Sequence, residues 1–152
     1  MKINYAVIYP NVKRQAPNPS DDERMIVGAM EVGCETWKTS AGMRHAMCET
    51  LFAGFGNHPG NEHDQMMMEG IEWDSGDPGV NRAHSYWQGA HVRSMSVGDL
   101  INIDPAGLNE YWICCSCGFT LLFPEQADAW LNYPRHFGCC GFELNKWLET
   151  QL

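Results

Sequence analysis

The sequence of 152 residues has no long apolar run and little positive charge, and each absence removes a class of function. No segment approaches the roughly 20 consecutive apolar residues that a membrane-spanning helix needs, and no charged and then apolar leader is present. We therefore expect a cytoplasmic protein with no membrane partner. Its 10 Lys and Arg against 19 Asp and Glu give a net charge of −9. This charge repels phosphate backbones and opposes direct binding of nucleic acid.

Motifs of the common enzyme classes are missing as well. The chain contains no G-x-S-x-G elbow, no Walker loop and no G-x-G-x-x-G turn. The segment from His58 to His63 is one residue longer than the H-x-x-E-H zinc-peptidase motif, and its Pro59 and Gly60 oppose the helix that the motif requires. We therefore expect a binding protein rather than an enzyme.

What is present is the patterning of an α+β domain, densest in the middle of the chain. The apolar runs Met95–Ile103 and Tyr111–Phe123 flank Asp104–Asn109, whose Pro and Gly suit a tight reversal, so we predict a β-hairpin. Within the first run, Gly98 can adopt a positive φ and Asp99 can cap nearby backbone N–H groups. Both faces of the second run are apolar, which predicts that both are buried.

The remaining elements complete a small, mainly antiparallel sheet with one main packed helix. Methionines and aromatic residues recur every four positions after Ser40, which predicts a capped helix over Ala41–Phe55. Pro124 suits the first position of a further helix. The other predicted elements are strands at Ile3–Tyr9 and Met25–Val32 and C-terminal helical turns near Ala127 and Trp147.

We expect a single domain over residues 1–152, with a central hairpin at 93–123, an irregular acidic segment at 57–88 and a helical segment at 124–152. The irregular segment has no clear periodicity, which is typical of a functional or disordered loop. Its acidic residues form either a solvated loop or a surface that binds a partner. Its tryptophans either fill in for missing aliphatic residues or anchor a protein partner. The candidate partner-binding residues are Glu62, Asp64, Glu69, Glu72, Asp74, Asp77, Trp73 and Trp87.

Seven cysteines, an odd number without an export signal, favour thiols or a metal over disulfides. Cys114, Cys117, His136 and Cys140 could complete a zinc tetrahedron, with zinc as the only cofactor that the sequence suggests. One alternative is that these cysteines are buried thiols, because free cysteine is among the most buried residue types. The other is that they take part in redox chemistry.

The central region also carries a resemblance to a known family. The stretch from Arg93 to Ile101, followed by Tyr111–Trp112 and Ser116–Phe119, resembles the signature of the YodL-like domains of phages and mobile elements. Upstream, Cys48–Asn57 is similar to the helix of that family that ends in an F-N step, so the resemblance covers residues 47–122. It implies a small accessory protein of a virus or mobile element.

Three functional hypotheses follow. The first is a phage or mobile-element accessory protein that binds a host protein stoichiometrically through its acidic surface and inhibits antiviral defence. The second is a binder of a small nucleotide-type ligand, with Arg82, Arg93 and Lys38 gathered around the phosphate. The third is a zinc-ribbon-like interaction module, in which the metal ties the central strand to the C-terminal segment.

Overall fold

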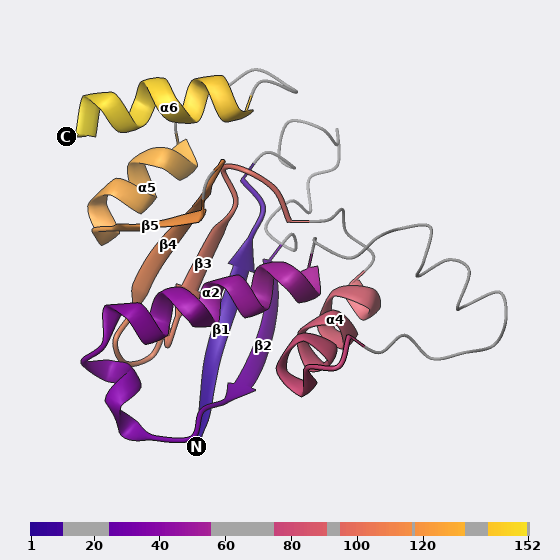
Figure 1. Ribbon diagram of the computed structural model, residues 1–152. Coiled ribbons are helices and arrows are strands. Elements are labelled where there is room, and N and C mark those ends of the chain that lie inside the picture. Colours follow the sequence, from indigo (N-terminus) through magenta and orange to yellow (C-terminus); the bar gives the residue numbers. More distant parts are fainter. Residues whose placement is uncertain (11–24, 56–74, 91–94, 117, 133–139, 152) are drawn as a thin grey trace, which may run out of the picture.

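The protein is an α+β domain built on a five-stranded antiparallel sheet, as the sequence predicts (Figure 1). The computed structural model describes residues 1–10, 25–55, 75–90, 95–116, 118–132 and 140–151. The strand order is β2-β1-β3-β4-β5, and every pair of neighbours is antiparallel. The strands are β1 (Lys2–Ile8), β2 (Met25–Glu31), β3 (Leu100–Ile103), β4 (Glu110–Cys115) and β5 (Gly118–Leu122).

Helices cover both faces of the sheet. Helix α2 crosses one face, α4 lies beside it next to β2, and α5 and α6 stack at the other end of the sheet, near β4 and β5 (Figure 1). Within the described ranges, every helix is too short or too polar to cross a membrane. The helices are the short 3₁₀ helix η2 (Glu35–Lys38), α2 (Ala41–Phe55), α4 (Pro78–Ala90), α5 (Pro124–Asn132) and α6 (Cys140–Gln151).

Helix α2 has the boundaries that the sequence predicts. The Oγ of Ser40 accepts a hydrogen bond from the backbone N–H of Met43 at 3.2 Å, which satisfies one free donor of the first turn. Met47, Leu51 and Phe55 turn toward the sheet and are buried. The predicted C-terminal helices are also confirmed, as α5 and α6.

The predicted hairpin is confirmed in β3 and β4, which pair from Leu100 with Ile113 to Ile103 with Glu110. The turn between them is held by Asp104, whose Oδ2 accepts the backbone N–H of Leu108 at 2.9 Å. Gly98 has a φ of 94°, as expected. The Oδ2 of Asp99 accepts the backbone N–H of Ser96 at 2.8 Å, so this residue caps the loop before β3.

The prediction of one strand over Tyr111–Phe123 is wrong, because the chain reverses after Cys115. Strand β5 returns antiparallel to β4, with Gly118 opposite Cys115. Gly118 has a φ of 123°, a conformation that residues with a Cβ rarely adopt. A single glycine therefore converts the expected long strand into a second hairpin and adds an edge strand.

The prediction of an irregular segment over 57–88 is wrong for its last part, because α4 begins at Pro78. The Oδ1 of Asp77 accepts the backbone N–H groups of Gly79 at 2.8 Å and Val80 at 3.4 Å, which caps the helix. Residues 56–74 lie outside the described residues.

The sheet separates two cores. Because successive residues of a strand point to opposite faces, Ile101 and Trp112 pack on α2, whereas Leu100 and Ile113 face α5 and α6. On the second face, Trp130 is fully buried and donates from Nε1 to the backbone carbonyl of Gly98 at 2.8 Å. Both faces of β4 are therefore buried, as predicted.

Candidate functional site

Most of the predicted partner-binding residues lie outside the part of the chain that the structure describes. These residues are Glu62, Asp64, Glu69, Glu72, Trp73 and Asp74. Asp77 is described and acts as the cap of α4. Trp87 is half-buried against the first core, with its ring centroid 5.4 Å from that of His84. The acidic partner surface stays a prediction.

The predicted zinc ligands are described only in part. Cys114 is buried against the α2 side of the sheet, and burial, with smaller contributions from Asp99 and Cys115, raises the pKa of its thiol to about 12. Cys117 and His136 lie outside the described residues, as does the side chain of Cys140. Among the residues that are described, no three His, Cys, Asp or Glu side chains are grouped closely enough to hold a metal ion. The zinc site stays a prediction.

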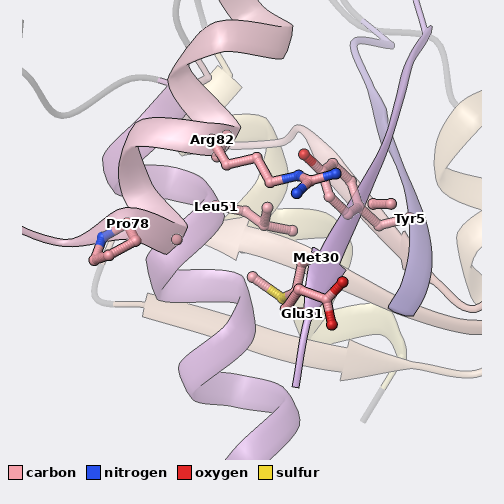
Figure 2. Close-up of a pocket in the computed structure, with 9 residues that line it drawn as sticks. Tyr5, Met30, Glu31, Leu51, Pro78 and Arg82 are labelled. Atoms are coloured by element: carbon pink, nitrogen blue, oxygen red, sulfur yellow. The ribbon is translucent and has the colours of Figure 1, made fainter. Parts of the chain in front are cut away.

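The structure contains a pocket between α4 and the β1–β2 end of the sheet, and Arg82 is the one described lining residue that the sequence predicted as a ligand contact (Figure 2). Its volume is about 320 Å³, and three of its lining residues, Tyr5, Glu31 and Arg82, carry ionisable side chains. The other lining residues are small or apolar: Ala29, Met30, Leu51, Pro78, Gly79 and Ala83.

Close packing of α4 on α2 forms one wall of this pocket. A Cβ at Gly54 would lie 2.5 Å from the Cβ of Ala83 and 2.8 Å from the backbone oxygen of Val80. Only glycine allows the two helices to approach this closely. Helix α4 is thereby held above β2, and the space between them is the pocket.

Tyr5 places a polar atom in this mostly apolar site. Its side chain is 1% exposed, and its hydroxyl has no hydrogen-bond partner among the described residues. The phenol lies over Gly28 of the neighbouring strand, where a Cβ would be 2.5 Å from the hydroxyl oxygen. Edge contacts with Phe55 and Tyr86, each with ring centroids 6.2 Å apart, fix the ring.

The electrostatics of the site keep this phenol neutral. Burial, assisted by Tyr86, raises the pKa of Tyr5 well above its usual value, and the positive charge of Arg82 only partly opposes the shift. Tyr5 is therefore an O–H donor over the whole physiological pH range. A buried donor without an acceptor costs free energy, about 1–3 kcal/mol for a typical group.

A second cavity, of about 390 Å³, lies between α2 and the β4–β5 turn. It is lined by Glu49, Phe52, Cys114, Cys115, Ser116, Gly118 and Phe119. None of the buried polar atoms that lack a partner in the described structure belongs to these residues. The described lining of this cavity therefore holds no buried polar atom that a ligand would supply with a missing hydrogen bond. The pocket beneath α4, which holds such an atom, is the better candidate.

The sequence did hold a signal for the helix that covers the pocket. Asp77 followed by Pro78 is a helix start, and Val80, Ala83, His84 and Trp87 have helical spacing. Glycines and polar residues obscured this pattern. The pairing of Tyr5 with Gly28 has no local signal, because the two residues belong to different strands.

Comparison of the chain with protein-family models, with curated proteins and with solved structures found no match.

Proposed function

We propose that this protein is a binding domain that takes a small ligand in the pocket beneath α4. The observation that carries the proposal is the buried hydroxyl of Tyr5, which lines a cavity of about 320 Å³ and has no partner among the described residues. Ligand sites of small molecules begin at roughly this size. A ligand acceptor would give the hydroxyl its missing hydrogen bond.

Binding rather than catalysis fits the chemistry of the lining residues. Among its described lining residues, the pocket presents no cysteine, serine or histidine that could act as a nucleophile or as a base near neutral pH. Tyr5 is held protonated by burial, so it can donate a hydrogen bond but does not accept a proton. The walls are mainly apolar, which suits retention of a ligand.

Screening a fragment library by methyl NMR tests this function. We expect hits to shift the methyl signals of Met30, Leu51 and Ala83, which line the pocket. A library of several chemical classes that leaves these signals unchanged would contradict the proposal.

Gly28→Ala is expected to abolish or strongly reduce fragment binding. The new Cβ would lie 2.5 Å from the hydroxyl oxygen of Tyr5, so the phenol must move from its place in the pocket. Gly33→Ala is the matched control, because a Cβ there has no atom within 4 Å. Equal fragment affinities for the two variants would show that the hits bind elsewhere.

A second candidate function is binding of a host protein, with inhibition of antiviral defence. The resemblance to YodL-like accessory proteins and the acidic charge support this role. So does strand β5, an edge of the described sheet, where Leu121 in the strand and Phe123 just after it are 44% and 73% exposed. Exposed edges of this kind can pair with another chain.

Pull-down from a host lysate at low and high salt tests this second function. We expect a protein that is retained at low salt and released at high salt, because charge complementarity is screened by ions. The double variant Leu121→Ser, Phe123→Ser should lose it if the edge of β5 takes part. Retention by that variant would move the partner surface away from β5.

A further inference from the structure

Arg82 lines the pocket with a positive charge that is not paired with any described residue. Figure 2 shows its guanidinium beside the phenol of Tyr5, and its charge acts on that phenol. It makes no ion pair or hydrogen bond with any described residue. A guanidinium offers several N–H donors in one plane, an arrangement that matches the two oxygens of a carboxylate.

The one acidic residue among the described lining residues does not neutralise Arg82. Glu31 has a different partner, the terminal ammonium of Met1, at 3.2 Å from its Oε2. Its negative charge nevertheless stays close to the cavity that it lines. The described lining of the pocket therefore offers a ligand one cation and one neutral O–H donor, with a carboxylate that opposes further negative charge.

The remaining lining residues favour a ligand whose main part is apolar. Met30, Leu51 and Pro78 line the cavity with side chains that have no polar group able to donate a hydrogen bond. A ligand that fills this space removes apolar surface from water, which favours binding. The volume of about 320 Å³ accommodates a ring with a short substituent.

We propose that the ligand of this pocket is a small organic acid with one carboxylate and an apolar body of about one ring. The inference rests on the proposed ligand-binding function. The carboxylate accepts hydrogen bonds from the guanidinium of Arg82 and from the hydroxyl of Tyr5. The apolar body lies between Leu51, Met30 and Pro78.

A nucleotide polyphosphate fits the site less well than such an acid. The sequence suggested that Arg82, Arg93 and Lys38 gather around a phosphate. Lys38 instead follows Trp37 in η2, with its Nζ 5.7 Å from the centroid of that ring, and is not among the lining residues of the pocket. Arg93 lies outside the described residues. Arg82, the one cation among the described lining residues, shares the lining with the carboxylate of Glu31 and so offers a polyphosphate too little positive charge.

Titration of the full chain with benzoate, benzamide and ATP, followed by methyl NMR, tests the ligand class. We expect benzoate to shift the signals of Met30, Leu51 and Ala83 and to bind at least about tenfold more tightly than benzamide or ATP. Benzamide has the same ring without the negative charge, so it isolates the contribution of the carboxylate. Binding of benzamide or ATP as tight as that of benzoate overturns the proposal.

Two variants assign the roles of the residues. Arg82→Gln should weaken benzoate binding about ten- to hundredfold, whereas Lys38→Gln, which removes the same charge outside the pocket, should change it less than about twofold. Tyr5→Phe should weaken binding roughly two- to tenfold without lowering the melting temperature, because it removes a buried hydroxyl that has no partner. A Tyr5→Phe protein that melts at a lower temperature shows that the hydroxyl already has a structural partner and overturns its role.

The failures of the two proposals are distinguishable. Fragment hits in the pocket that include no carboxylate, or unchanged benzoate affinity in Arg82→Gln, defeat the organic-acid proposal and leave the ligand-binding function standing. No binding of any fragment or probe in the pocket defeats both.

Discussion

Replacement of Arg44 by methionine is expected to lower the free energy of unfolding by about 3–5 kcal/mol, the cost of breaking a buried ion pair. The Nε of Arg44 donates to Glu110 Oε1 at 2.6 Å, and both side chains are almost buried, with exposures of 10% and 13%. Nη1 donates to the backbone carbonyls of Trp37 and Lys38 at 3.0 and 2.9 Å. This one side chain therefore ties α2 to β4 and to η2.

Methionine retains much of the apolar stem of Arg44 but none of its donors. Among the described residues, Glu110 would keep only the hydrogen bond from Trp112 Nε1, at 2.7 Å, and would remain a nearly buried charge without its cation. Urea unfolding measures the loss, and hydrogen exchange should show faster opening of residues 35–38. A loss below about 1 kcal/mol would mean that solvent reaches Glu110 and that the pair contributes little.

The exposed pair of His45 and Glu49 provides the matched control on the same helix. Their closest atoms, Nδ1 and Oε1, are 3.6 Å apart, and the side chains are 37% and 62% exposed. Glu49→Gln should therefore change the free energy of unfolding by less than about 0.5 kcal/mol. The two variants thus compare a nearly buried arginine–carboxylate pair with an exposed pair whose histidine is charged only when protonated.

Gly54→Ala is expected to destabilise the protein by about 1–3 kcal/mol, the usual cost of overpacking a core. Helix propensity alone predicts the opposite sign, because alanine is favoured over glycine inside a helix by about 1 kcal/mol. The steric effect should win, since the new Cβ would meet the backbone oxygen of Val80 at 2.8 Å and the backbone nitrogen of His84 at 2.9 Å. Backbone atoms of a packed helix cannot move aside as a flexible side chain can.

Gly42→Ala in the same helix is the control for Gly54→Ala. Its nearest neighbour would be the Oγ of Ser40 at 3.8 Å, an ordinary contact. This variant should therefore gain up to about 1 kcal/mol from helix propensity. Thermal and urea unfolding of both variants measure the difference. Stabilisation by Gly54→Ala as well would show that α4 does not pack closely on α2. It would also contradict the conclusion that this packing forms one wall of the pocket.

The sequence by itself determined the elements whose causes are local. The apolar spacing after Ser40 is enough to define α2, because a capped helix needs only its own residues and one face to bury. The turn at Asp104–Asn109 is likewise defined by its own turn residues, and it brings together two apolar runs as β3 and β4. These local patterns predicted the α+β class. They also predicted that both faces of β4 are buried.

Tertiary structure decided what depends on residues far apart in the chain. The reversal before β5 was missed because an apolar run continues through Gly118, and only pairing with β4 shows that this glycine has a positive φ. The pocket depends on Gly54 meeting Ala83 and on Tyr5 lying over Gly28. Such contacts are set by sheet register and helix packing, which have no periodic signal in either segment alone. The candidate site therefore emerged from the fold, whereas the helices and the central hairpin could be predicted from the sequence.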